Sequence, residues 1–147
     1  MLVSSLVLAL WFSPIAPAQA PVGACSLLTK ELALKVTSSP NKAVFDQLPP
    51  QEEKIPGGTS CDYGDIRIQV KGKQGEAYLK NFATWTPVPD VGDRALYRAN
   101  RTRYAELLVL TGASTLEIQM GVPTGGTPEQ VKVKAIELAK ALVPKLK

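Results

Sequence analysis

Four arginines lie within ten residues of one another and are interleaved with two tyrosines. The cluster consists of Arg94, Arg98, Arg101, Arg103, Tyr97 and Tyr104. Guanidinium groups bind carboxylates and phosphates through paired N–H donors, and tyrosine rings add apolar and cation–π contacts. On a β-hairpin these side chains could bind an acidic protein surface, anionic lipid headgroups or a polyanionic cell-wall polymer. The alternative is a solvated edge hairpin whose charges prevent edge-to-edge pairing.

Four aspartates are a second candidate for chemistry: Asp62, Asp65, Asp90 and Asp93. Paired carboxylates can perform acid–base catalysis or bind calcium, and Asp62 with Asp93 would be such a pair in a histidine-free hydrolase. The four residues lie close to Gly or Pro, in predicted turns. Aspartate is favoured in turns because its side chain accepts hydrogen bonds from nearby backbone amides. We therefore expect turn residues.

Two other short motifs are weaker. Residues 121–127 precede a helix N-terminus, which attracts anions. The segment lacks the Lys-Ser/Thr pair of a phosphate-binding loop, and Glu129 would repel an anion. Asn100-Arg101-Thr102 is formally a glycosylation sequon, which matters only in a host that glycosylates.

Composition excludes several kinds of catalytic site. The 147-residue chain has no histidine and two cysteines, with 17 Lys and Arg against 13 Asp and Glu. Without histidine there is no Ser-His-Asp or Cys-His catalysis and no imidazole ligand for a metal or haem. Two cysteines are too few for a four-thiolate zinc or iron–sulfur site. We therefore expect no metal and no cofactor. The length and the 45% of apolar residues in the chain predict one folded domain.

The first twenty residues carry no charge and have the pattern of a secretory signal peptide. An apolar run from Leu2 to Phe12 is followed by two prolines and by Ala18-Gln19-Ala20, a small-x-small triplet. The run is shorter than the roughly 20 residues that span a bilayer. We expect a signal peptide at 1–20, a mature domain at 21–147, and export to the periplasm or the extracellular space. A buried N-terminal strand or helix is the alternative.

The two cysteines, Cys25 and Cys61, are predicted to form a disulfide. An exported protein meets an oxidising environment, in which two cysteines most simply pair. The bond would close a loop of about 37 residues and stabilise the fold by about 3.8 kcal/mol. It would span residues 37–60, which we expect to be a Pro/Gly-rich loop. The spacing differs from the Cys-x-x-Cys of redox sites.

A lipid anchor is the minor alternative for Cys25. Val22-Gly23-Ala24-Cys25 loosely resembles a lipobox, in which the cysteine becomes the lipidated N-terminus. The match lies beyond two prolines and far from the apolar run, and lipidation would leave Cys61 unpaired.

Apolar periodicity predicts a helix and a hairpin in the first half of the mature chain. The helix at 27–36 has Thr29 as its N-cap, because the hydroxyl can accept from the first-turn amides. The hairpin at 60–71 follows from the alternation of apolar and polar residues between Ile66 and Lys71.

A second helix is predicted at 76–85. It places Tyr78, Phe82 and Trp85 at helical spacing, and we expect the three rings to face the core. Because Trp85 lies at the end of this helix, it could instead line a groove.

The rest of the chain is predicted to form a three-stranded meander and a long helix. The strands are expected at 95–99, 104–111 and 115–121. The helix begins at Thr127, with Pro128 at its first position and Gln130 completing a capping box. Its apolar stripe consists of Val131, Ala135, Leu138, Ala139, Leu142 and Leu146.

The element order α-ββ-α-βββ-α lacks a repeated βαβ crossover. We therefore expect an α+β domain with an antiparallel sheet of about five strands and the long C-terminal helix packed on one face.

Three motifs resemble a pattern found in small bacterial exported domains of unknown function, many of them lipoproteins. The motifs are Cys25-Ser26-Leu27-Leu28-Thr29, Cys61-Asp62-Tyr63 and Val91-Gly92-Asp93-Arg94-Ala95. The resemblance implies a disulfide-linked α+β envelope domain and names no catalytic residue. This chain departs from the lipoprotein members because it lacks a convincing lipobox.

The expected function is an exported, non-enzymatic envelope protein that binds a partner or small ligand through the sheet and the arginine hairpin. The partner would be an envelope protein or an anionic polymer, with no nucleic acid and no transmembrane span, and the chain would be a monomer. Two alternatives stay open: a histidine-free hydrolase with paired carboxylates, and a purely structural or inhibitory domain that presents residues 37–60.

Overall fold

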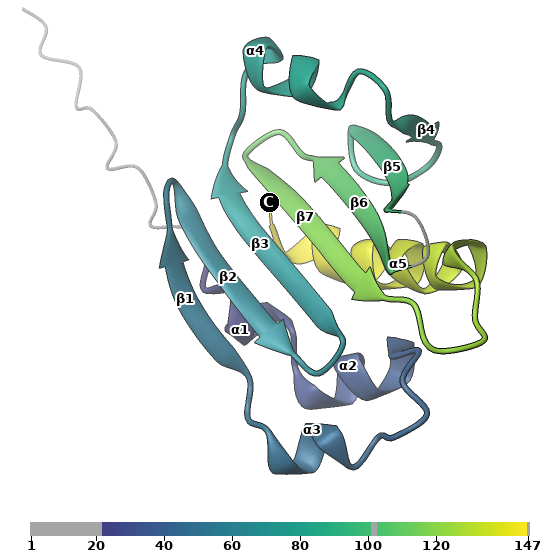
Figure 1. The fold of residues 1–147 in the computed structure, drawn as a ribbon. Helices are drawn as coiled ribbons and strands as arrows, with labels where there is room; N and C mark the ends of the chain where they lie inside the picture. The colour runs from purple at the N-terminus through teal and green to yellow at the C-terminus, as the bar shows by residue number, and fades with distance from the viewer. Residues whose placement is uncertain (1–21, 101–102, 147) are drawn as a thin grey trace, which may run out of the picture.

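Seven antiparallel strands form one sheet, which is the framework of the protein (Figure 1). The computed structural model describes residues 22–100 and 103–146. The strands are β1 (Gln51–Ile55), β2 (Gly58–Tyr63), β3 (Ile66–Gly72), β4 (Thr86–Val88), β5 (Arg94–Asn100), β6 (Tyr104–Leu110) and β7 (Ser114–Gly121). Their order across the sheet is β1-β2-β3-β7-β6-β5-β4, so the first three strands join the last four through the β3–β7 pair.

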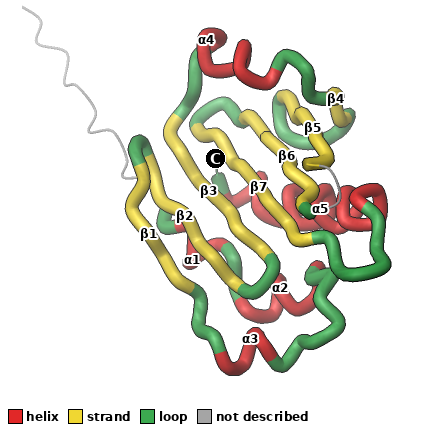
Figure 2. The backbone as a smooth tube through the Cα atoms, viewed as in Figure 1, coloured by secondary structure: helices red, strands yellow, loops and turns green. Residues whose placement is uncertain are grey.

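Helices cover one face of this sheet (Figure 2). The helical segments are α1 (Ala24–Leu27), α2 (Lys30–Val36), α3 (Val44–Gln47), α4 (Glu76–Leu79), the 3₁₀ segment η1 (Lys80–Phe82), α5 (Pro128–Leu142) and the 3₁₀ segment η2 (Val143–Lys145). α5 packs on β6 and β7, α1 packs on β2, and α2 packs against α5. The opposite face, toward the viewer in Figure 1, is open except at the end where α4 and η1 lie. We call it the open face.

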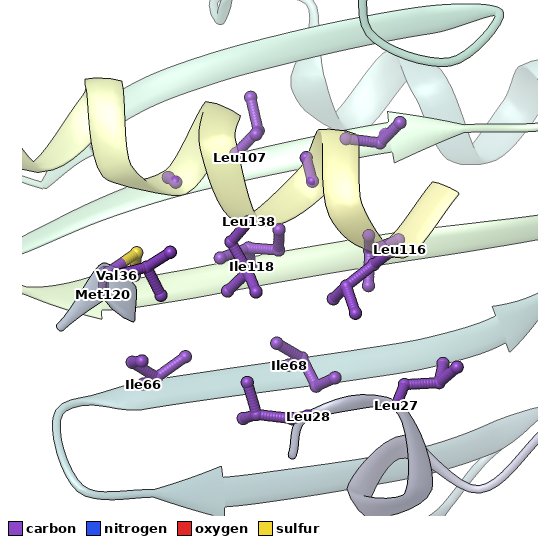
Figure 3. Packing of buried hydrophobic residues seen from close by; sticks show 14 of the residues in the cluster. Leu27, Leu28, Val36, Ile66, Ile68, Leu107, Leu116, Ile118, Met120 and Leu138 are labelled. Carbon is purple, nitrogen blue, oxygen red and sulfur yellow. The ribbon is translucent and has the colours of Figure 1, made fainter. Parts of the chain in front are cut away.

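The core lies between the sheet and helices α1, α2 and α5 (Figure 3). Side chains alternate along a strand, so every second residue of β3, β6 and β7 points toward the helices. The most deeply buried residues there, each no more than 1% exposed, include Leu28, Val36, Ile66, Ile68, Leu107, Leu116, Ile118, Met120 and Leu138. Burying one such side chain stabilises the fold by about 1.5–3 kcal/mol.

The predicted start of the C-terminal helix is confirmed. The Thr127 hydroxyl accepts from the Gln130 amide, and the Gln130 side chain accepts from the Thr127 amide. Pro128 stands at the first helical position, and every residue of the predicted apolar stripe is buried.

The predicted strand number was wrong: the α+β class holds, but the sheet has seven strands and not five. The additional strands are β1 and β4, one at each edge. β1 lies within residues 37–60, and four of its five residues are exposed. Its sequence, Gln-Glu-Glu-Lys-Ile, therefore lacks the apolar alternation of a half-buried strand. β4 has only three residues, contains Pro87 and directly follows the helix predicted at 76–85.

The helix predicted at 76–85 is shorter than expected. α4 covers Glu76–Leu79, η1 continues to Phe82, and neither contains a buried residue. Tyr78, Phe82 and Trp85 therefore do not form the buried face of one helix.

The predicted disulfide between Cys25 and Cys61 is present and attaches α1 to β2. Two hydrogen bonds reinforce this junction: the Ala24 amide donates to Thr59 Oγ1 at 2.8 Å, and the Cys25 amide donates to Glu52 Oε2 at 2.8 Å. The signal peptide predicted at 1–20 lies outside the described residues. Among the helices that the structure describes, none is long and apolar enough to cross a bilayer.

Candidate functional site

The open face carries a row of polar side chains in register across five strands. From β2 to β5 the row is Asp62, Arg67, Gln119, Glu106 and Arg98. At one end Arg67 donates to both carboxylate oxygens of Asp62, at 2.5 and 3.0 Å. At the other end Arg98 donates to Glu106 Oε2 from two nitrogens, at 2.9 and 2.6 Å. Gln119 therefore lies between two ion pairs.

The hydrogen bonds from Arg67 to Asp62 have an electrostatic consequence. They raise the pKa of the Arg67 guanidinium above its ordinary value, although partial burial opposes the effect. Arg67 is thus a fixed cation in the middle of the sheet.

A second polar network attaches α4 to the open face. Glu117 Oε1 accepts from Lys71 Nζ at 2.8 Å and from the Tyr78 hydroxyl. Burial, and then the hydrogen bond to Glu117, raise the pKa of the Tyr78 hydroxyl well above its ordinary value. The phenol therefore stays a donor to Glu117 and holds α4 against β7.

Three aromatic rings form a wall at this end of the open face. Tyr78 and Phe82 have ring centroids 5.0 Å apart, and Phe82 and Trp85 have centroids 4.8 Å apart. The Trp85 ring also faces the Arg98 guanidinium, 4.7 Å from its central carbon. These half-buried rings lie outside the core between sheet and helices, so the prediction that they face the core was wrong. The alternative, that Trp85 lines a groove, fits the structure.

A pocket of about 130 Å³ opens beside Trp85. Its polar and aromatic lining residues are Arg67, Gln69, Trp85, Glu106, Glu117 and Gln119. A neighbouring hollow of about 380 Å³ shares Arg67 and Gln119 and extends to Asp62 and Tyr104. The two hollows therefore lie next to each other on the open face, and we call them together the Trp85 groove.

A larger hollow of about 540 Å³ lies near the C-terminal end of α5. Asp93 is its sole charged lining residue, beside Gly92, Thr111, Gly112, Ala113 and Val143. Few polar groups converge there, whereas convergent polar groups are typical of ligand sites.

The structure divides the predicted arginine–tyrosine cluster. Arg94, Arg98 and Tyr104 lie on the open face, because they alternate with the core-facing residues of β5 and β6. Tyr97 is 7% exposed on the core face and donates its hydroxyl to the Pro128 carbonyl at 3.1 Å. Arg103 is exposed in the β5–β6 turn, and Arg101 lies outside the described residues. Arg98 is already ion-paired, so these residues do not form one exposed cationic patch.

The four aspartates also separate. Asp62 binds Arg67, and Asp65 accepts from Thr37 Oγ1 at 2.6 Å and from the Ser38 amide at 3.2 Å. Asp90 occupies a turn with φ of 59°, and Asp93 lies in the next turn before β5. The distance from β2 to β5 is four strand spacings, about 19 Å at about 4.8 Å each, so Asp62 and Asp93 do not form an acid–base pair.

Neither of the other motifs forms a recognisable site. The capping box occupies amide donors at the α5 N-terminus that an anion would need. Within residues 22–100 and 103–146, no group of three acidic or cysteine side chains could hold a metal ion. The glycosylation sequon includes two residues outside the described ranges.

Sequence reasoning missed Gln69, Glu106 and Gln119 as site residues. The alternation in β3 and β7 predicts that Gln69 and Gln119 point away from the core. It does not predict that β3 pairs with β7, and this pairing brings the two glutamines to one pocket.

Comparison of the chain with protein-family models, curated proteins and solved structures finds no match. The resemblance to bacterial exported domains therefore stays a prediction.

Proposed function

We propose that the protein is an exported, non-enzymatic binding protein of the cell envelope, and that the open face of its sheet is the binding surface. The observation that carries this proposal is the Trp85 groove. An aromatic ring, two amide side chains and several ion-paired groups converge on its pocket. A concave site with a few convergent polar groups is the usual form of a ligand-binding site.

Export is supported by the uncharged, apolar first twenty residues and by the disulfide. Disulfides persist in oxidising compartments. The sulfur of Cys25 is bonded to Cys61, and a thioether-linked lipid would need the same atom. The disulfide thus favours an unanchored protein over lipidation at Cys25.

Binding is favoured over hydrolysis by the state of the two pocket glutamates. Glu106 and Glu117 lie diagonally across β6 and β7 and line one pocket, as a catalytic pair would. An acid–base pair needs one carboxyl that donates a proton. Here both glutamates accept hydrogen bonds from cationic side chains, so both act as acceptors.

Co-sedimentation of the full chain with fractions of its native envelope tests the binding surface. Gln119→Arg places a bulky cation in the centre of the open face and should weaken the apparent affinity about fivefold, equivalent to about 1 kcal/mol. Val133→Arg is the matched control, because Val133 is 64% exposed on α5, which packs on the opposite face. Equal binding by both variants and the parent protein would overturn the assignment of the open face.

Intact-mass measurement of the protein from its native host tests export. The expected mass corresponds to a chain without residues 1–20 and with two hydrogens lost to the disulfide. A lipid on Cys25, or an uncleaved and reduced chain, would contradict the proposed compartment.

A further inference from the structure

We propose that the Trp85 groove binds a neutral, hydroxyl-rich ligand, with one sugar ring of a glycan chain seated beside Trp85. This inference rests on the proposed function and adds the chemical class of the ligand. It differs from the sequence-based expectation, which named an envelope protein or an anionic polymer as the partner.

The charges around the groove give no net positive charge. The cations are Arg67, Lys71 and Arg98, and each forms an ion pair with one of the anions Asp62, Glu106 and Glu117. A fourth anion, Asp65, also lines the larger hollow and accepts from Thr37 Oγ1. A polyanion would have to displace the carboxylates and would meet no net positive charge, so electrostatics gives it no advantage over a neutral ligand.

The uncharged donors and acceptors of the pocket have free hydrogen-bonding capacity. Among the described residues, the side-chain amides of Gln69 and Gln119 form no hydrogen bond with other protein groups, and both residues are half-buried. A glutamine amide offers two N–H donors and one carbonyl acceptor, whereas a sugar hydroxyl is both donor and acceptor. The two glutamines are diagonal neighbours across β3 and β7, a separation of about 7–8 Å between backbones. They can therefore bind hydroxyls at two edges of one ring.

The Trp85 ring supplies the apolar surface that a sugar ring needs on its C–H face. Its orientation is fixed by Phe82 on one side and by Arg98 on another. A preorganised ring loses little conformational entropy when a ligand stacks on it.

The backbone around the groove argues against an extended peptide as the ligand. β3, β7 and β6 are interior strands whose ladders are paired on both sides. Strand addition needs an unpaired sheet edge, which this part of the surface does not offer. The groove must therefore recognise its ligand through side chains, as proteins do when they bind a carbohydrate.

The size of the groove fits a chain of rings. The pocket beside Trp85, at about 130 Å³, is smaller than the roughly 300–1,000 Å³ of sites for drug-sized molecules. It suits a single ring. The adjoining hollow of about 380 Å³, which Tyr104 also lines, offers space for further units.

Titration of the full chain with neutral oligosaccharides tests the proposal. Chitotriose, cellotriose and maltotriose are the neutral probes, and a polygalacturonate fragment is the anionic one. The protein carries Trp11→Phe, so that Trp85 is its remaining tryptophan and reports on the groove by fluorescence. Saturable binding of a neutral probe at concentrations up to about 10 mM, independent of salt, is the expected result; it detects a Kd of about 1 mM. No saturation with any neutral probe, or salt-sensitive binding of the anionic probe alone, would overturn the proposal.

Three variants in the groove and one control variant outside it locate the binding, and calorimetry measures the affinity of each. Trp85→Ala should weaken affinity at least tenfold, about 1.4 kcal/mol, and Trp85→Phe should weaken it less because a planar ring remains. Gln119→Ala should weaken affinity severalfold, whereas Gln47→Ala, at an exposed glutamine on α3 outside the groove, should leave it unchanged. If Trp85→Ala fails to fold, Gln69→Ala takes its place. Equal affinity of all folded variants would contradict the assignment.

The two proposals fail in different ways. Loss of envelope binding in Gln119→Arg, combined with no response to neutral oligosaccharides, would reject the ligand class and keep the binding surface. Unchanged envelope binding in Gln119→Arg, with no saccharide response, would reject both.

Discussion

Trp85 lies over the guanidinium of Arg98, whose central carbon is 4.7 Å from the indole ring centroid. The same guanidinium donates to Glu106 on the neighbouring strand. Trp85, on the segment after η1, is thereby coupled to β5 and β6, and the wall of the groove depends on the sheet beneath it.

Arg98 should therefore contribute more to stability than its neighbour Arg103. Arg98→Ala removes a cation–π contact and a partly exposed ion pair, and should lower the free energy of unfolding by about 1 kcal/mol. Arg103→Ala, in the β5–β6 turn, should change it by less than about 0.5 kcal/mol. Urea unfolding of both variants measures the difference, and equal losses would contradict the coupling of Trp85 to the sheet.

Removal of the disulfide should destabilise the protein. The double variant Cys25→Ala, Cys61→Ala loses a cross-link between residues 36 positions apart, and its free energy of unfolding should fall by about 2–4 kcal/mol. Reduction of the parent protein with dithiothreitol should give the same urea midpoint as the double variant. A midpoint unchanged by either treatment would contradict this prediction.

Replacement of Thr115 by valine should raise the free energy of unfolding. Its hydroxyl is buried and has no hydrogen-bond partner within the described residues, so its burial costs free energy without compensation. Thr115→Val keeps the shape and should raise the free energy of unfolding by about 1 kcal/mol. Thr37→Val is the matched control, because the Thr37 hydroxyl donates to Asp65, and it should lower stability by about 1–3 kcal/mol. Thermal melts distinguish the two signs.

Stability should fall at alkaline pH, in part through Tyr78. The pKa of this phenol is raised in the folded protein, so the folded state keeps a proton that the unfolded state releases above about pH 10. The stabilisation is complete below that pH and is lost as pH rises toward the folded pKa. Tyr78→Phe should reduce this slope in urea midpoints measured between pH 8 and about 11. Some slope should persist, because burial also raises the pKa of Tyr97. An identical slope in Tyr78→Phe would contradict the role of the phenol.

Gly64 should be less replaceable than Gly57. Both have positive φ, 64° and 80°, which costs a residue with a side chain about 1–2 kcal/mol. A Cβ on Gly64 would also lie 2.5 Å from Phe45 Cζ, whereas a Cβ on Gly57 would meet no atom within 4 Å. Gly57→Ala should therefore cost about 1 kcal/mol and Gly64→Ala about 3 kcal/mol, because overpacking adds to the strain. Chemical denaturation compares the two, and equal costs would show that Phe45 moves freely.

Local patterns in the sequence predicted the elements that have one buried and one exposed face. The alternation Ile66, Ile68, Val70 and the capping box at Thr127 each depend on neighbours a few residues away, and both were correct. β1 was missed for the opposite reason. As an exposed edge strand it needs no apolar alternation, and its charged residues suit an edge that must not pair with other chains.

The candidate site was less predictable because it depends on contacts between distant parts of the chain. The arginine–tyrosine cluster was identified from residues close in sequence, yet alternation along β5 sends Tyr97 to the core and Arg98 to the open face. Gln69 and Gln119 are 50 positions apart, and only the β3–β7 register makes them neighbours. Long-range strand pairing of this kind has no local signal in a single sequence.

The β3–β7 pairing also has a consequence for how the protein folds. β1–β3 and β4–β7 are each built from strands that follow one another along the chain, whereas β3 and β7 pair across residues 73–113. Closing that long loop is the slow, entropically expensive step for such a topology. The groove straddles this seam, with Arg67 and Gln69 on one side and Glu117 and Gln119 on the other. A bound ligand would therefore contact both halves of the sheet, and the free energy of unfolding would rise with occupancy of the groove.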